Sequence, residues 1–272
     1  MRREWGGPIT RGGLDCVALI RVRPDHIGGP NPDRRIHRRA RLSGAGNRGA
    51  GARAPAARRT IKAFVVGAGR VAERLRWRSP AVPHGSTGNI SARLADGWLL
   101  TPTGSSLGTL RPEALSRLDD GGRLLSGDPP TKEKLLHLNM YAQRPRMGAV
   151  VHLHSTSSVA VVLLAEIPFE SALPPLTAYY VMRIGDLPLA PYFPPGDEGL
   201  AEAVSRDAVR HHALLLANHG PVVGGTDLLA ATDAVEELEA TARLYLSVRG
   251  VPLRVLTPEQ VAELKARFPV QC

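Results

Sequence analysis

The chain has 272 residues, of which 43% are hydrophobic, so it is long enough for one large domain or two small ones with a substantial core. Its formal net charge of +10 is concentrated at one end: residues 1–80 hold 18 Arg and one Lys against five acidic residues, whereas residues 81–272 hold 16 basic and 20 acidic residues. This distribution argues against nucleic-acid binding by the larger part, which also lacks a basic stripe with interleaved aromatic residues.

Two further features concern the compartment. No uncharged apolar run reaches about 18 residues, which argues against a membrane-spanning helix. The two cysteines, Cys16 and Cys272, lie at opposite ends of the chain and give no disulfide framework. This cysteine usage is typical of a reducing compartment, and we expect a cytoplasmic protein.

Residues 1–60 are rich in Arg, Gly, Pro and Ala and show no helical or strand period, so we expect a disordered extension. An organelle transit peptide is an alternative, because such peptides are rich in Arg and poor in acidic residues. Another alternative is that the segment is not a natural part of the protein, since the composition changes abruptly before residue 84. A misassigned start or a frameshift would produce such a change. We expect residues 61–272 to form the folded domain.

From residue 84 onwards strands and helices alternate, which predicts an α/β domain. Residues 97–101 have the pattern of a strand. Thr131 is the expected N-cap of a helix that carries core residues at helical spacing. These core residues are Leu135, Leu136, Leu138 and Met140. A second helix is expected at residues 158–166.

The remaining elements are helical apart from the strand at residues 214–218. Gly196 and Asp197 open a helix that extends toward His211, and residues 226–248 form another helix, which Gly250 ends. The predicted core positions of the latter are Leu229, Ala230, Ala234, Leu238 and Ala242. Residues 257–260 combine an N-cap, a proline at the first helical position and a capping-box glutamine, which predicts a short final helix.

Four side chains form the main candidate site. His152 and His154 lie two residues apart in the apolar run 148–154, and the period of two of a strand points both imidazoles to the same face. His219 lies at the end of another predicted strand, and Glu133 lies near a predicted helix start. Taken singly, each is most simply a hydrogen-bonded core histidine or an acid in a first helical turn. Together, three imidazoles and a carboxylate indicate a zinc site, and a catalytic zinc keeps a position for substrate.

Two glycine-containing segments, residues 85–89 and 101–105, combine backbone freedom with hydroxyl and amide groups that can hold an anion. They have the character of phosphate-binding loops. Neither matches the glycine patterns of nucleotide-binding proteins, so a nucleotide is not implied. On local sequence alone, two ordinary glycine turns explain them equally well.

At this point the chain shows a resemblance to the class II aldolase/adducin family. Five motifs occur in the family's order over about residues 84–268: Gly88–Arg93, Thr101–Gly104, Thr131–Glu133 with His137, His152–Ser155 and Asn218–Pro221. The resemblance implies a single three-layer α/β/α domain with a central, mainly antiparallel sheet. It also implies a homotetramer with sites between subunits.

The resemblance also implies roles for individual residues. It implies one zinc ion held by His152, His154 and His219, with Glu133 as a fourth ligand or as a displaced acid/base. The residues that match the family's phosphate-binding positions are Ser86, Asn89, Thr103, Gly104 and Thr131. Tyr180 matches a tyrosine that reaches a neighbouring subunit's site in related aldolases, and it is a second candidate for proton transfer. Lys132 stands where aldolases usually have a small hydroxyl residue, and its charge suits a second anion such as a carboxylate.

Within the family, the segments 130–133, 152–156, 179–182 and 192–197 are most similar to enzymes that decarboxylate 3-oxo-tetronate 4-phosphate. The resemblance therefore implies a carboxy-lyase that forms dihydroxyacetone phosphate and carbon dioxide through a metal-stabilised enediolate, with Glu133 as proton donor. The same chemistry would serve a sugar-phosphate aldolase of the fuculose-phosphate type or a ribulose-phosphate 4-epimerase, and the sequence separates these poorly. A non-enzymatic interaction module, as in adducin, is a further alternative, but the retention of all four metal-binding groups argues against it.

Overall fold

The computed structural model describes residues 64, 67–68, 87–270 and 272, and every structural statement below concerns these residues. The predicted extension at residues 1–60, the domain boundary that follows it and the predicted phosphate-binding residue Ser86 lie outside the described residues. Among the described helices, none combines the length and apolar character that crossing a membrane requires.

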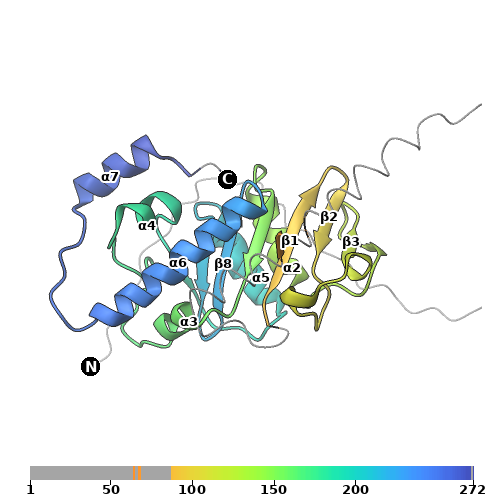
Figure 1. Cartoon of the computed structure of the whole chain (residues 1–272), viewed down its shortest axis with the longest axis horizontal. Coiled ribbons are helices and arrows are strands. Elements are labelled where there is room, and N and C mark those ends of the chain that lie inside the picture. The colour runs from red at the N-terminus through yellow and green to blue at the C-terminus, as the bar shows by residue number, and fades with distance from the viewer. Residues whose placement is uncertain (1–63, 65–66, 69–86, 271) are drawn as a thin grey trace, which may run out of the picture. The chain divides into compact units, whose positions relative to one another are not determined.

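An eight-stranded sheet forms the centre of the described part, in the order β4-β3-β2-β1-β5-β8-β7-β6 (Figure 1). Every neighbouring pair is antiparallel except β6 and β7. The strands are β1 (Asn89–Leu94), β2 (Gly97–Leu100), β3 (Ser116–Leu118), β4 (Leu124–Ser126), β5 (Ala149–His152), β6 (Leu189–Ala190), β7 (Ala213–Leu216) and β8 (Gly220–Gly225). The predicted mainly antiparallel sheet is confirmed.

Helices cover both faces of this sheet because its strands bury side chains on both sides. Val151 and Leu215 belong to one core cluster, whereas Val150 and Leu214, one residue earlier in each strand, belong to the other. The first face is covered by α3 (Thr156–Val162), α4 (Ala178–Arg183) and α6 (Leu228–Val248), with α7 (Pro258–Arg267) against α4. The second face is covered by α2 (Lys134–Gln143) and α5 (Glu198–Ala208). Two short 3₁₀ turns, η1 (Leu107–Thr109) and η2 (Pro112–Ala114), join β2 to β3. The three-layer α/β/α architecture is therefore confirmed.

Several helix ends agree with the prediction. Asp197 caps α5 through its carboxylate, which accepts a hydrogen bond from the Gly199 backbone amide, although the helix ends at Ala208 before reaching His211. At α7 the Thr257 hydroxyl accepts from the Gln260 amide at 3.3 Å, and the Gln260 side chain accepts from the Thr257 amide at 2.9 Å. The predicted capping box is thus present in full.

Other predicted bounds were wrong. Helix α2 begins at Lys134 with Glu133 at the N-cap, because the Thr131 hydroxyl accepts from the Glu133 amide and closes a separate turn before the helix. Helix α3 spans Thr156–Val162 and not residues 158–166. The predicted strand at 148–154 ends at His152, so His154 lies beyond it.

Two predicted core positions of α6 are not buried. The Leu229 side chain is 61% exposed and Ala230 is partly exposed, whereas Ala234, Leu238 and Ala242 are buried as expected. The buried stripe of α6 starts at Ala231, and a residue two positions earlier is about 200° away around the helix. Leu229 therefore faces away from the sheet.

Candidate metal centre

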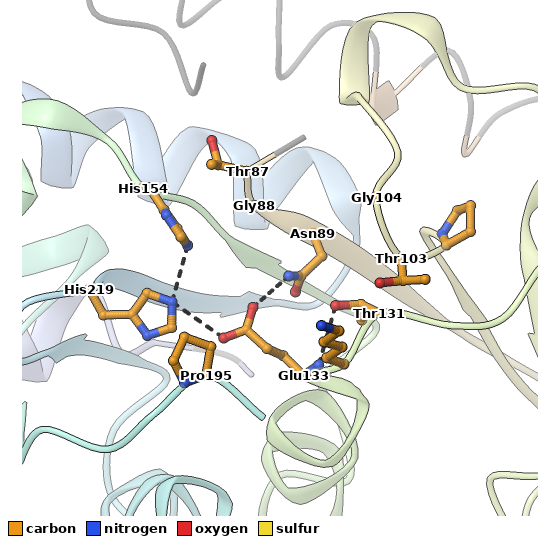
Figure 2. Close-up of a pocket in the computed structure, with 12 residues that line it drawn as sticks. Thr87, Gly88, Asn89, Thr103, Gly104, Thr131, Glu133, His154, Pro195 and His219 are labelled. Carbon is orange, nitrogen blue, oxygen red and sulfur yellow. Dashed lines mark hydrogen bonds and ion pairs between the residues drawn. The ribbon is translucent and has the colours of Figure 1, made fainter. Parts of the chain in front are cut away.

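The structure brings the four predicted metal-binding side chains together. One ligand atom from each of Glu133, His152, His154 and His219 lies within 4.8 Å of all the others. The Glu133 carboxylate spans the group, with Oε2 3.3 Å from His152 Nε2 and Oε1 3.3 Å from His219 Nε2. His219 Nε2 lies 3.1 Å from His154 Nε2. In Figure 2 His154, His219 and Glu133 point toward one another from three different segments of the chain.

The backbone explains how residues so far apart in sequence meet. His152 is the last residue of β5, and β5 pairs with β8 on one side and β1 on the other. His219 lies in the tight turn between β7 and β8, where Asn218 has a φ of 57°. Gly220 follows with a φ of 153°, and a Cβ there would lie 2.2 Å from the Leu153 carbonyl oxygen. Only glycine lets this turn approach the segment that carries His154 so closely.

The hydrogen bonds of His152 leave one ring nitrogen facing the cluster. The side chain is fully buried, and its Nδ1–H donates to the Pro221 carbonyl at 2.9 Å. Nε2 therefore carries a lone pair, and it has no hydrogen-bond partner among the described residues. Glu133 Oε1 is also buried without a hydrogen bond in the described part of the chain. Buried polar atoms without partners are costly, and a bound cation would satisfy both.

Electrostatics favour the metal-binding protonation states. Burial lowers the pKa of His152 and His154, and it lowers the pKa of His219 to about 4. Burial also opposes ionisation of Glu133, but the positive charge that the imidazoles carry when protonated, that of His152 first, and the hydrogen bond from the Asn89 amide lower the pKa of this carboxyl below its ordinary value. Neutral imidazoles and an ionised carboxylate are the forms that bind a divalent cation.

The spacing of the donor atoms suits a divalent cation. Bonds of about 2.1 Å in a tetrahedron place neighbouring donors about 3.4 Å apart. In the cluster, His152 and His219 each lie 3.3 Å from one of the two Glu133 oxygens, His154 and His219 are 3.1 Å apart, and one donor atom of each residue lies within 4.8 Å of the others. The residues present therefore fit a divalent cation with mixed nitrogen and oxygen ligands.

A pocket of about 180 Å³ opens beside the cluster (Figure 2). It contains five of the six predicted substrate-binding residues, the sixth being Ser86. The lining residues are Thr87, Gly88, Asn89, Pro102, Thr103, Gly104, Thr131, Lys132, Glu133, His154, Pro195 and His219. Three of the four metal-binding candidates thus line the same pocket as the predicted phosphate and carboxylate contacts.

Individual pocket residues differ in what they offer a ligand. Gly104 has a φ of 68° with open space where a Cβ would be, and Thr103 precedes it. Lys132 is exposed. The Asn89 amide donates a hydrogen bond to Glu133 Oε2 at 2.7 Å, so this side chain both lines the pocket and binds the carboxylate of the cluster. Pro195 was predicted only as part of the segment 192–197 and not as a site residue; it reaches the pocket from the loop before α5.

Tyr180 does not line this pocket. It is 1% exposed, lies on α4 in the core on the first face of the sheet, and donates a long hydrogen bond of 3.5 Å to the Leu173 carbonyl. Burial raises the pKa of its hydroxyl. A side chain held in its own core does not extend toward another subunit, and this placement gives no support to Tyr180 as a proton donor. Its neighbour Tyr179 is 61% exposed.

Comparison with known families gives one domain match. The model of the class II aldolase and adducin N-terminal domain matches residues 69–246. The chain belongs to the class II aldolase and adducin family. Within this family, the chain is 49% identical to 3-oxo-tetronate 4-phosphate decarboxylase of Haemophilus influenzae over 184 residues, which cover 67% of this chain and 88% of that protein.

Two further relatives place the chain within the family. It is 32% identical to L-fuculose phosphate aldolase of Escherichia coli over 188 residues, or 68% of this chain and 85% of that protein. The crystal structure of YgbL from Escherichia coli matches with a TM-score of 0.71 at 43% identity, covering 76% of this chain and 99% of that one. The predicted family and fold are therefore confirmed.

Proposed function

We infer that the protein is a carboxy-lyase that converts 3-oxo-tetronate 4-phosphate to dihydroxyacetone phosphate and carbon dioxide. The observation that carries this inference is the pocket that joins the Glu133 and histidine cluster to Thr103, Thr131 and Lys132. In a chain 49% identical to a decarboxylase of that substrate, this pocket has donors suited to each end of the molecule. The lower identity of 32% to an L-fuculose phosphate aldolase makes aldol cleavage the weaker assignment.

His152, His154 and His219 would hold one divalent cation, and we propose zinc because of the three imidazole donors. When bound, the cation supplies Lewis-acid stabilisation of the negative charge that develops as the carbon bond breaks. Support comes from the lone pair of His152 Nε2, which the Pro221 carbonyl fixes toward the cluster. Glu133 would act either as the fourth ligand or as the acid/base.

The substrate has a carboxylate on a hydroxyl-bearing carbon, which is flanked on the other side by a ketone. Loss of carbon dioxide leaves an electron pair on the hydroxyl-bearing carbon, in conjugation with the ketone. A proton delivered to that carbon completes dihydroxyacetone phosphate. Glu133 is the proposed donor because its carboxylate lies at the wall of the pocket. It is ionised at rest, so the proton must first reach it from solvent through the pocket.

The remaining pocket residues would orient the two anionic ends. Thr103 and Thr131 offer hydroxyl groups for the phosphate, and Gly104 offers its backbone N–H; the N–H groups of Thr103 and Thr131 already donate to the carbonyls of Pro129 and Thr101. Lys132 would hold the carboxylate before it leaves as carbon dioxide, since a flexible ammonium pairs readily with a single anionic group. Binding both ends places the bond that breaks beside Glu133.

Two coarser features of the protein extend this proposal. We propose a homotetramer with sites between subunits, which the family resemblance implies, and a cytoplasmic location, which the cysteine usage favours.

The test is a comparison of three substrates. We expect the purified protein supplied with zinc to release carbon dioxide and dihydroxyacetone phosphate in equal amounts from 3-oxo-tetronate 4-phosphate. L-Fuculose 1-phosphate and ribulose 5-phosphate should react far more slowly. A Glu133→Gln variant is the matched control, because it keeps the size of the side chain but removes the acid. Rapid cleavage of L-fuculose 1-phosphate without decarboxylation of the acid would contradict the assignment.

A further inference from the structure

A continuous row of buried hydrogen-bonded side chains lies behind Glu133. The Tyr141 hydroxyl is 2.8 Å from Ser91 Oγ, Ser91 Oγ is 2.7 Å from His137 Nδ1, and His137 Nε2 is 2.5 Å from Asn89 Oδ1. Asn89 Nδ2 then donates to Glu133 Oε2 at 2.7 Å. Ser91 and His137 are fully buried, and Tyr141 is 2% exposed. Apart from Glu133 itself, Asn89 is the one member of this row that lines the pocket.

The row follows from the spacing of residues on two facing elements. Asn89 and Ser91 are two residues apart on β1 and therefore point to the same face of the sheet. Glu133, His137 and Tyr141 are four residues apart at the start of α2 and along it, so they share one face of that helix. The helix lies on this face of the sheet, and the two sets interleave.

The chemistry of the Glu133 end fixes the direction of every bond. An ionised carboxylate only accepts, so Asn89 must present its NH₂ group to Glu133 and its oxygen to His137. His137 must therefore carry a proton on Nε2. In a neutral imidazole Nδ1 is then an acceptor, which makes Ser91 the donor to it and Tyr141 the donor to Ser91. All four bonds point toward Glu133.

We propose that Ser91 and His137 are positioning residues of the reaction: through the tautomer of His137 they fix the amide of Asn89 and so hold the Glu133 carboxylate against the histidine cluster. The role of Glu133 rests on the proposed function, whereas the direction of the row rests on the hydrogen bonds alone. The hydroxyl of Ser91 determines which ring nitrogen of His137 carries the proton. Without this hydroxyl, His137 Nδ1 loses its donor, and the imidazole is free to move its proton to Nδ1.

That change of tautomer would alter the hydrogen bonds of Asn89 and Glu133. An unprotonated Nε2 would face Asn89 Oδ1 as one acceptor against another, so the amide would turn over and present its oxygen to Glu133. The carboxylate would lose its donor and meet a second acceptor. Removing a side chain that orients a metal ligand through hydrogen bonds typically lowers metal affinity or activity by about 10–100-fold.

The experiment compares Ser91→Ala with Ser116→Ala. Both serines are fully buried in neighbouring parts of the sheet, but the Ser116 hydroxyl donates to the Asp128 carbonyl and has no part in the row. We expect Ser91→Ala to lower kcat for decarboxylation by about 10–100-fold, with a smaller effect on KM because Thr103, Thr131 and Lys132 on the pocket wall are not part of the row. Ser116→Ala should leave kcat unchanged, and so should Tyr141→Phe, because Ser91 can still donate to His137.

The second readout needs no turnover. In metal-free wild-type protein labelled with ¹⁵N-histidine, the NMR shifts of His137 should identify the Nε2–H tautomer, and in Ser91→Ala they should change. A wild-type Nδ1–H tautomer, or a kcat for Ser91→Ala equal to that of Ser116→Ala, would overturn the proposal. Wild-type protein that releases no carbon dioxide would defeat the proposed function, and the tautomer measured without metal would still decide the direction of the row.

Discussion

The carboxylate of Glu239 ties helix α6 to the start of α3, and its neutralisation should destabilise the fold by a predictable amount. Glu239 is 3% exposed, and its oxygens accept from the backbone amides of Ser157 and Ser158 at 2.7 and 2.9 Å and from the Ser158 hydroxyl at 2.8 Å. Among the described residues, the side chain of Ser155, the N-cap of α3, makes no capping bond, so the carboxylate of another helix caps α3 instead.

In Glu239→Gln one carboxylate oxygen becomes an NH₂ group, which cannot accept from a backbone amide. One buried N–H of the α3 start then loses its acceptor, and the remaining bonds lose their charge. A hydrogen bond to a charged group contributes about 1.5–3 kcal/mol, so we expect a loss of about 2–3 kcal/mol in the free energy of unfolding. For a domain of this size the corresponding fall in Tm is about 5–10 °C.

Urea unfolding and thermal melting of the metal-free protein would measure this effect. The matched control is Glu237→Gln on the same helix, because within the described part of the chain that partly exposed carboxylate accepts a single bond of 3.4 Å, from Thr241. We expect the control to change stability by less than about 0.5 kcal/mol. Equal stability of the two variants would refute the assignment of Glu239 as the cap of α3.

Three further predictions follow from the pocket and the chain ends. Lys132→Ala should raise KM for 3-oxo-tetronate 4-phosphate more than KM for a neutral sugar phosphate such as L-fuculose 1-phosphate, and equal effects in steady-state assays would remove the carboxylate role of Lys132. Gly220→Ala should lower zinc affinity in a competition titration and also lower Tm, since a Cβ at this position meets the Leu153 carbonyl at 2.2 Å; unchanged affinity would show that the turn carrying His219 is not constrained by this contact. A chain that begins near residue 60 should keep the decarboxylase activity of the full chain or exceed it, because we propose residues 61–272 as the catalytic domain; loss of activity with the fold retained in circular dichroism would show that the extension contributes to the site.

The elements predicted best are those with local signals. The capping box of Thr257 and Gln260 and the cap at Asp197 depend on residues within one helical turn, and both are present. The sheet and its predominantly antiparallel pairing were predicted through the family resemblance, since strand order depends on contacts between distant segments that periodicity does not encode.

The errors have physical reasons of the same kind. Leu229 was expected in the core because it is apolar and near a helix start, but the buried stripe of α6 is set by its contact with the sheet and begins at Ala231. Thr131 was expected as a helix cap, but its hydroxyl closes the turn that places Glu133 at the start of α2. Tyr180 is a different case: packing of α4 buries it in the core, and its role in a site, which the family resemblance implied, stays a prediction.

The site itself was largely predictable at the level of residue type. His152 and His154 were predicted from their spacing of two within one strand and His219 from its position at a strand end, and the turn at Asn218 and Gly220 brings them together. His137 was noticed only as part of a motif. Its place between Ser91 and Asn89 depends on how α2 lies over β1, which the sequence of either element alone does not specify.

The central claim is that Glu133 and the three histidines bind a divalent cation on which carbon–carbon cleavage depends. The most direct measurement is metal content by mass spectrometry, combined with carbon dioxide release, for wild-type protein and His154→Ala before and after chelation. We predict one zinc per wild-type chain, loss of activity on chelation, recovery when zinc is restored, and neither metal nor activity in His154→Ala. Full turnover by wild-type protein from which all metal has been removed would contradict the account.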